Sequence, residues 1–424
     1  MVGAMSWSWA AAAAGVVFVT VGLSACGSSA GSQSGKTTRT LSPGSTVATR
    51  SSRAETVTTA TRASRSGNLF VPSQIVEAGT SVTVFLLGTG RCNGQFCVEL
   101  WRGQGEHYVQ VTAPPNAVTV GSTDIASAQL VFANADDGYA LAYGSAAGAG
   151  STAFATIDGG KSWQSVPLTG GAPRGMVATS VAASDGEFYA LLGCTGSGGS
   201  KCSGLRLARS TAGSTRWSSV PVPGDVPAGA WTGLGAAAGT VFINFPRSRL
   251  SAVPRLLTSV NGSPRFTTVA ASGLSSGQGA CGLSPMSQGA IWALCPQGMT
   301  EIYYRSNDGG RHFSAFWQPF QTGGGSFDPV NATTAYRWTG VGSGNVGIAH
   351  QVVPANALQQ TYDGGIHFTP LAKPPASLSR GGTPTVLFTG GGTVDGYFLA
   401  GAGTSGSGLA YTGNGGDSWS IVQF

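Results

Sequence analysis

The chain has 424 residues and a formal net charge of +6, and only 9% of its residues are charged. Its 67 glycines raise the alternative of a disordered chain, but a hydrophobic share of 41% argues against disorder over most of the length. Many glycines with few charges are typical of an all-β protein with many turns, so we expect one large β domain rather than several average ones.

The first 26 residues are typical of an export signal. Residues 7–23 are apolar, and Leu23-Ser24-Ala25-Cys26-Gly27 resembles a bacterial lipobox, in which the cysteine is lipidated and becomes the first mature residue. No Lys or Arg precedes Cys26, which departs from the usual signal, and an uncleaved membrane anchor is the alternative because the run is near spanning length. We predict a lipid anchor at Cys26 and a location at the extracytoplasmic face of the cell membrane.

Residues 27–66 are rich in Ser, Thr and Gly and lack the apolar content of a core, so we predict a flexible tether. The tether carries six Lys and Arg residues against Glu55 alone, a net charge of +5 out of the chain's +6. Its basic character favours contact with anionic lipid or wall polymer. Export makes nucleic acid an unsuitable partner.

From residue 67 to residue 424 a phrase of eight residues recurs: a hydroxyl residue, any residue, Asp, Gly, Gly, two more residues and an aromatic. The clearest copies are Thr156–Trp163, Ser306–Phe313 and Thr361–Phe368, and Thr412–Trp419 has Asn414 in place of Asp. Three weaker copies bring the count to seven, and the closing aromatics stand at 108, 163, 217, 266, 313, 368 and 419, between 47 and 55 residues apart. A regular period of this length predicts a repeat architecture.

Each copy predicts a tight turn between two strands. Asp or Asn can hydrogen-bond its own backbone, glycine supplies the positive φ, and the aromatic packs against the sheet that it follows. The acids and aromatics with this structural role are Asp158, Trp163, Asp308, Phe313, Asp363, Phe368, Asn414 and Trp419. Four strands fit in each repeat, as in Gln129–Ala133 and Tyr139–Tyr143 ahead of Thr156, which predicts a seven-bladed β-propeller.

The phrase resembles the Asp-box, or BNR-like, repeat of sialidases, sortilin-type receptors, some xyloglucanases and seven-bladed photosystem II assembly factors. Residues 132–140 ahead of Thr156–Trp163 look most like the last group, and the resemblance covers roughly residues 68–424. It implies an all-β propeller with Asp-box turns on one face and ligands on the other. It says little about activity, since one fold hosts many functions.

Six cysteines remain after Cys26, an even number that fits an oxidising compartment. They lie in neighbouring pairs, so of the 15 possible connectivities we favour local disulfides: Cys92 with Cys97, Cys194 with Cys202, and Cys281 with Cys295. A metal site is the alternative, but CxxC spacing and nearby His are lacking. We expect no cofactor.

Catalytic signatures are sparse. Glycoside hydrolysis requires two carboxylates, or a Tyr–Glu pair with an Asp acid and three arginines in sialidases. Glutamate occurs at only six positions, and three of the aspartates belong to the repeated turns. The four His residues are not clustered, and three of them directly precede a closing aromatic, as expected of a solvated turn. A carbohydrate-active enzyme, sialidase-like or endo-glucanase-like, is therefore the alternative rather than the favoured function.

A binding function is favoured. The loops on the face opposite the repeated turns carry cations opposed by Asp225, Asp328 and Asp124, and two of the predicted disulfides would stiffen them. The candidate ligand-binding residues are Arg91, Arg174, Lys201, Arg247, Arg249 and Arg380. We predict a monomeric binding or assembly scaffold for a protein or an anionic glycan. Ring closure is left open: either the end blades meet without strand exchange, or residues 55–72 supply a strand to the last blade.

Overall fold

The computed structural model describes residues 70–424 except 80–81, 94, 116, 121–123, 127, 143–152, 169–175, 195–203, 224–232, 246–254, 275–280, 298–299, 318–325, 340–344, 347–351, 354–355, 376–377, 379–383, 390–394 and 401–407. The predicted signal and tether lie outside the described residues. Among those described, no helix is long and apolar enough to cross a membrane.

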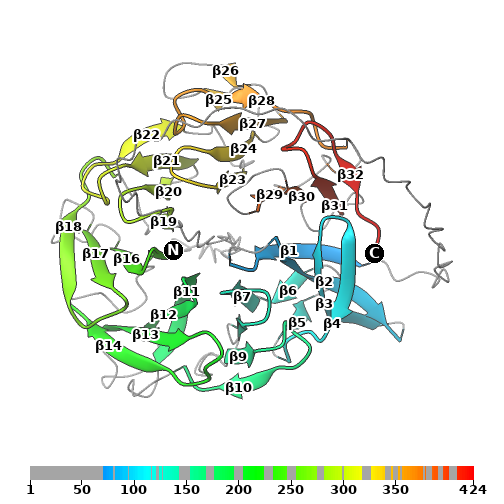
Figure 1. Ribbon diagram of the computed structural model, residues 1–424, viewed down its shortest axis with the longest axis horizontal. Helices are drawn as coiled ribbons and strands as arrows, with labels where there is room; N and C mark the ends of the chain where they lie inside the picture. Colours follow the sequence, from blue (N-terminus) through cyan, green and yellow to red (C-terminus); the bar gives the residue numbers. More distant parts are fainter. Residues whose placement is uncertain are drawn as a thin grey trace, which may run out of the picture.

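Seven four-stranded antiparallel sheets form a ring around a central axis, which confirms the predicted seven-bladed propeller (Figure 1). We number them as sheets 1 to 7 in chain order. Sheet 1 contains β1(Val71–Glu77), β2(Val84–Cys92), β3(Gln95–Gln104) and β4(His107–Val111), and sheet 2 contains β7(Ala128–Phe132), β8(Gly138–Ala142), β9(Ala153–Thr156) and β10(Gln164–Val166). Sheet 3 contains β11(Met176–Ser184), β12(Glu187–Cys194), β13(Leu205–Thr211) and β14(Ser218–Val222), and sheet 4 contains β15(Gly233–Ala237), β16(Thr240–Phe245), β17(Arg255–Val260) and β18(Phe266–Ala270). Sheet 5 contains β19(Gly282–Pro285), β20(Ile291–Gln297), β21(Thr300–Ser306) and β22(Ser314–Trp317). Sheet 6 contains β23(Ser326–Pro329), β24(Ala335–Thr339), β27(Ala357–Thr361) and β28(Thr369–Pro370). Sheet 7 contains β29(Thr385–Phe388), β30(Gly396–Leu399), β31(Leu409–Thr412) and β32(Ser420–Ile421).

Two short hairpins interrupt this order. The pair β5(Val118–Val120) and β6(Asp124–Ala126) lies in the connection from sheet 1 to sheet 2, and β25(Asn345–Val346) pairs with β26(Val352–Val353) between the second and third strands of sheet 6. In sheets 2 to 7 the repeated phrase connects the third and fourth strands, and in sheet 1 it includes the ends of these two strands and the turn between them. The phrases therefore all lie on one face of the ring.

The strong copies of the phrase share one hydrogen-bond pattern. In sheet 5, the hydroxyl of Ser306 donates to Oδ1 of Asp308 (2.8 Å) and accepts from the amide of Gly310 (2.9 Å). Oδ1 of Asp308 also accepts from the amide of His312 (3.0 Å), while Gly309 and Gly310 adopt φ of 74° and 87°. Because both the acid and the glycines are used within the turn, the phrase is self-contained.

The copy in sheet 1 folds differently. Strands β3 and β4 pair as far as Gln104↔His107, so only Gly105 and Glu106 form the turn. The copy lacks the acid, and a tight hairpin replaces the longer turn. Its aromatic, Tyr108, is still buried.

The core consists of side chains packed between neighbouring sheets. Tyr139 of sheet 2 meets Phe188 of sheet 3 with ring centres 4.6 Å apart, and Trp338 of sheet 6 meets Phe398 of sheet 7 at 5.0 Å. Alternate residues of each strand face opposite neighbours, so one sheet contributes to two layers of the core. Each sheet is therefore packed against the sheets on both sides of it.

The ring closes without strand exchange among the described residues. Among the described residues, sheets 1 and 7 are each built from four consecutive strands of their own, and the chain from Val71 onward pairs within sheet 1. Residues 55–69, the rest of the segment in the second alternative, lie outside the described residues. The two ends of the described chain meet instead in a cluster of aromatic rings, where Phe424 lies 4.9 Å from Phe70, 5.5 Å from Trp101 and 5.5 Å from Tyr108. We call these four residues the aromatic clasp.

The structure confirms two of the three predicted disulfides, Cys92–Cys97 and Cys281–Cys295. The second is fully buried between β20 and the residue before β19. Cys194 is also disulfide-bonded, but Cys202, its predicted partner, lies outside the described residues.

Candidate functional site

One of the six predicted ligand-binding cations lies in the described part of the chain. Arg91 is exposed near the end of β2. The other five fall outside the described residues: Arg174, Lys201, Arg247, Arg249 and Arg380. The hairpin that carries Arg91 is therefore the candidate site, and we call its end, residues 91–93 and 95–97, the β2–β3 tip.

The β2–β3 tip is held by the backbone and by a covalent link. Strands β2 and β3 pair from Val84↔Gly103 to Cys92↔Gln95, and Asn93 in the turn adopts a φ of 53°, which Asn tolerates better than most residues. The Cys92–Cys97 disulfide joins the two strands, with 5.7 Å between the Cα atoms. Such a tip has little conformational freedom left to lose on binding.

One face of the tip presents an aromatic ring and a cation. Arg91 and Phe96 are cross-strand partners, and the guanidinium carbon lies 5.3 Å from the centre of the ring. Phe96 remains 46% exposed. A cation–π contact at an exposed site contributes about 0.5–1 kcal/mol, so the pair is ordered yet still available to a partner.

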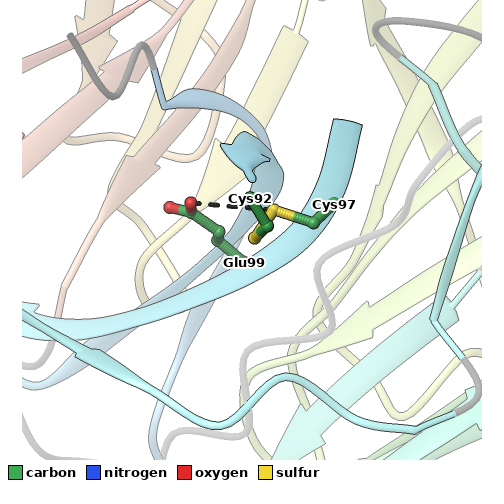
Figure 2. A group of neighbouring side chains, drawn as sticks. All are labelled: Cys92, Cys97 and Glu99. Atoms are coloured by element: carbon green, nitrogen blue, oxygen red, sulfur yellow. Dashed lines mark hydrogen bonds between the residues drawn. A yellow bond between two sulfur atoms is a disulfide. The ribbon is translucent and has the colours of Figure 1, made fainter. Parts of the chain in front are cut away.

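The other face of the hairpin carries Cys97, Glu99 and Trp101, which alternate along β3. Figure 2 shows Cys97 and Glu99 of this face together with Cys92. Glu99 is only 2% exposed. The indole Nε1 of Trp101 donates to Oε2 of Glu99 (2.9 Å), and Oε1 lies 4.0 Å from Sγ of Cys97. A buried carboxylate thus lies directly beside the disulfide.

A groove of about 530 Å³ lies at the opposite end of β3, along the outer edge of sheet 1. Its wall includes Arg102, His107 and Lys161 together with one carboxylate, that of Glu106. Arg102 forms an ion pair with Asp136 (3.4 Å) and the hydroxyl of Ser420 donates to Glu106. These partners leave a groove of mixed charge with only one carboxylate in its wall.

The described aspartates of the repeated phrase have structural partners. Partial burial acts to raise the pKa of Asp363, but hydrogen bonds from the backbone and ring of His367 lower it to about 2. The pKa of Asp308 is lowered by the same contacts from His312, against the same effect of burial. The side chain of Ser162 is the main cause that lowers the pKa of Asp158. These carboxylates are ionised turn residues, and none has the raised pKa of a general acid.

Asp328 has a raised pKa, and its position differs from the prediction. The sequence suggested a surface acid opposing the cationic loops, but Asp328 lies on β23 and is 3% exposed. Burial raises its pKa to about 7, while the hydrogen bond from the amide of Phe388 (2.5 Å to Oδ2) lowers it. The prediction of a surface acid was wrong because Asp328 joins the inner strands of sheets 6 and 7.

Sequence reasoning missed three arginines that link neighbouring sheets. Each lies on the third strand of one sheet and reaches the phrase or an adjoining loop of the next. Nη1 of Arg209 donates to the carbonyl of Asn261 (2.8 Å), and Nη1 of Arg305 lies 3.3 Å from the carbonyl of Gly364. Arg102 makes its ion pair with Asp136 in the same way. Arg209 and Arg305 directly precede the hydroxyl residue of their own phrase, a signal that the sequence did contain.

Comparisons with known proteins give low similarity. No protein-family model matches the chain, and no curated protein matches it. Among solved structures, YCF48 from Cyanidioschyzon merolae is similar at 13% identity over 69% of this chain and 83% of that chain, with a TM-score of 0.45. The β-propeller domain of the Trilobed protease from Pyrococcus furiosus is similar at 9% identity over 84% of this chain and 98% of that chain, with a TM-score of 0.48. The GH74 xyloglucanase from Xanthomonas campestris is similar at 15% identity over 83% of this chain and 64% of that chain, with a TM-score of 0.30. At these values no argument about function rests on the likeness.

Proposed function

We propose that this chain is an exported, lipid-anchored scaffold whose propeller binds a partner at the extracytoplasmic face of a cell membrane. In this proposal residues 1–26 are a lipoprotein signal, residues 27–66 are a flexible basic tether, and residues 67–424 form the propeller. The lipobox-like run that ends at Cys26 and the basic composition of residues 27–66 support the anchor and the tether. We also propose that the repeated phrase belongs to the Asp-box class, on the strength of its hydroxyl, acid and glycine contacts.

The β2–β3 tip is the observation that carries the binding function. Aromatic residues and Arg are enriched at protein interfaces, and the tip exposes one of each on a cross-linked support. The ring of Phe96 supplies apolar area, and the guanidinium of Arg91 can bind a carboxylate or a sulfate. A partner with an acidic group next to an apolar surface, either a protein or an anionic glycan, fits this arrangement.

The direction of the chain is consistent with this role. Val71, the first residue of β1, pairs with Thr89, which lies next to the tip on β2. The described part of the propeller therefore begins on the same face as the tip, and a tether that enters there would keep the tip within reach of partners at the membrane. About 40 flexible residues span roughly 35 Å root-mean-square, so the tether allows the propeller to reorient above the membrane.

Crosslinking in intact cells tests the proposal. We expect the wild-type chain to capture a defined protein or glycan, and the Arg91→Ala/Phe96→Ala variant to capture roughly tenfold less, as expected for the loss of two central contacts. Ile157→Ala is the matched control, because Ile157 is 61% exposed but lies on the opposite face of the ring. Equal capture by the double variant would refute the tip as the binding surface, and turnover of a captured glycan would favour the glycoside hydrolase.

A further inference from the structure

The β2–β3 tip and the residue beneath it hold the ligand atoms of a metal site. We propose that Cys92, Cys97 and Glu99 bind a thiophilic divalent cation, Zn²⁺ or a chemically similar ion, when the Cys92–Cys97 disulfide is reduced. The two Sγ atoms and a carboxylate oxygen of Glu99 lie within 4.8 Å of one another. The disulfide and the metal site are thus two states of the same three residues, as Figure 2 shows for the disulfide form.

Strand register places the three ligands on one face of the hairpin. Gly90 pairs with Cys97, so Cys92, two residues after Gly90, lies on the same face as Cys97 and Glu99. Arg91 and Phe96 form the next cross-strand pair and therefore face the other way. The proposed metal site and the proposed partner-binding pair can be altered independently.

Glu99 is positioned as a ligand needs to be. A Cβ at Gly90 would lie 1.9 Å from Oε1 of Glu99, so only glycine leaves room for the carboxylate at this point. The indole of Trp101 holds Oε2, which turns Oε1 toward the sulfur of Cys97. Hydrogen bonds of this kind orient metal ligands and strengthen binding.

Among the described residues, Oε1 of this carboxylate contacts the sulfur of Cys97. Glu99 is 2% exposed, and the sulfur beside Oε1 has no hydrogen to donate once it is part of a disulfide. Burial of a carboxylate is costly unless the group is paired or coordinates a metal. A cation between the sulfurs and Oε1 would give this oxygen a positively charged partner.

The spacing suits tetrahedral coordination. Zn–S and Zn–O bonds of about 2.3 and 2.1 Å require S···S and S···O separations of roughly 3.8 and 3.6 Å. The distance between Sγ of Cys97 and Oε1 of Glu99 is already 4.0 Å. The two sulfurs reach their separation by rotation about the Cα–Cβ bonds after the disulfide opens. Cys92 is exposed, which leaves the fourth position to water.

The chemistry balances with a dithiol as reductant. The dithiol gives two electrons and two protons to the Cys92–Cys97 bond and becomes a disulfide, while Cys92 and Cys97 become thiols. Binding of the cation then releases both thiol protons, since the thiolate is the ligand. Exchange with a small-molecule disulfide reverses the step: that disulfide takes two electrons and leaves as two thiolates, while the Cys92–Cys97 bond re-forms and the cation is released.

Cobalt titration of the full chain tests the site. Cys26, Cys194 and Cys202 are replaced by Ser so that the tip holds the accessible cysteines, because Cys281 and Cys295 are fully buried. After treatment with a dithiol and its removal, we expect one Co²⁺ per chain with the visible bands of tetrahedral thiolate coordination, displaced by Zn²⁺. The oxidised chain should show no such bands.

Two variants separate the metal site from a structural role of Glu99. Glu99→Gln keeps an acceptor for the indole of Trp101 but is a poor ligand, so we expect Co²⁺ affinity to fall by roughly tenfold or more. Phe96→Ala lies in the same tip on the opposite face and should leave the affinity unchanged. As a second readout, Zn²⁺ should protect Cys92 and Cys97 from an alkylating reagent, and mass spectrometry measures this protection. Absence of binding to the reduced chain, equal binding to the oxidised chain, or an unchanged affinity in Glu99→Gln would each overturn the proposal.

Discussion

Replacing Asp328 by Asn should make the stability of the propeller less sensitive to a rise in pH from about 5 to about 8. Asp328 is buried between the inner strands of sheets 6 and 7, and its pKa is raised from 3.8 to about 7 in the folded chain. The folded state therefore holds a proton that the unfolded state has lost across this interval. The contribution of Asp328 to stability is greatest below the unfolded pKa and declines as pH rises toward the folded one.

The size of the effect follows from the shift. A difference of about three pKa units at about 1.4 kcal/mol each gives a loss of up to about 4 kcal/mol, of which roughly 2–3 kcal/mol falls between about pH 5 and pH 8. Asn keeps an oxygen that can accept from the amide of Phe388 and cannot ionise. Burial of the new NH₂ group of Asn can lower the free energy of unfolding by about 1–2 kcal/mol, and this cost is the same at every pH.

Urea denaturation followed by tryptophan fluorescence, at about pH 5 and pH 8, measures the difference. From about pH 5 to about pH 8, we expect the free energy of unfolding of the wild-type chain to fall by roughly 2–3 kcal/mol more than that of Asp328→Asn. Asp417→Asn, at an exposed position, serves as the control and should track the wild-type chain. Parallel curves for Asp328→Asn and the wild type would show that Asp328 does not hold a proton in the folded state, and the reasoning from burial would fail.

Four further predictions concern the turns and the ring. Gly310→Ala should lower the free energy of unfolding by about 2 kcal/mol more than Gly186→Ala. Both glycines have a positive φ, but a Cβ at Gly310 would lie 2.3 Å from Leu256, whereas a Cβ at Gly186 would have no atom within 4 Å. Equal losses of stability in thermal melts would contradict this prediction. Arg305→Met should cost about 1–2 kcal/mol through the lost bonds to the carbonyls of Asp363 and Gly364, against little change for the exposed Arg311→Met in denaturant titrations. Phe424→Ala should cost about 2 kcal/mol and raise hydrogen exchange in β1 and β32 first, and unchanged exchange there would refute the aromatic clasp. The pKa of Asp363 is lowered to about 2, so its contribution to stability is present above the unfolded pKa of 3.8 and lost as pH falls through about 2. In acid titrations, the difference in free energy of unfolding between the wild-type chain and Asp363→Asn should shrink over that window.

The seven repeats were predictable because their signal is local. Within Ser306–Phe313 the hydroxyl, the acid and the two glycines bond to one another, so the turn can be inferred from eight consecutive residues. The period of about 50 residues then fixed the number of sheets. The copy at residues 101–108 was the least regular in sequence, and it is the one that folds as a different turn.

Local pairing also explains which disulfides could be predicted. Cys92 and Cys97 lie on two strands of one hairpin, and Cys281 and Cys295 lie at one end of sheet 5. Closeness in the chain was enough to favour these pairs. The carboxylate of Glu99 beside Cys97 was not anticipated, because it depends on the alternation of β3 and on the space at Gly90.

The sequence by itself determined the period, the turn chemistry and the seven-sheet ring, since each depends on residues close together in the chain. Contacts between sheets were decided only by the tertiary structure. These include the burial of Asp328, the reach of Arg305 to the next sheet and the aromatic clasp that closes the ring. Each joins residues about 60 or more positions apart, and no pattern within one repeat specifies which side chain of the next sheet it will meet.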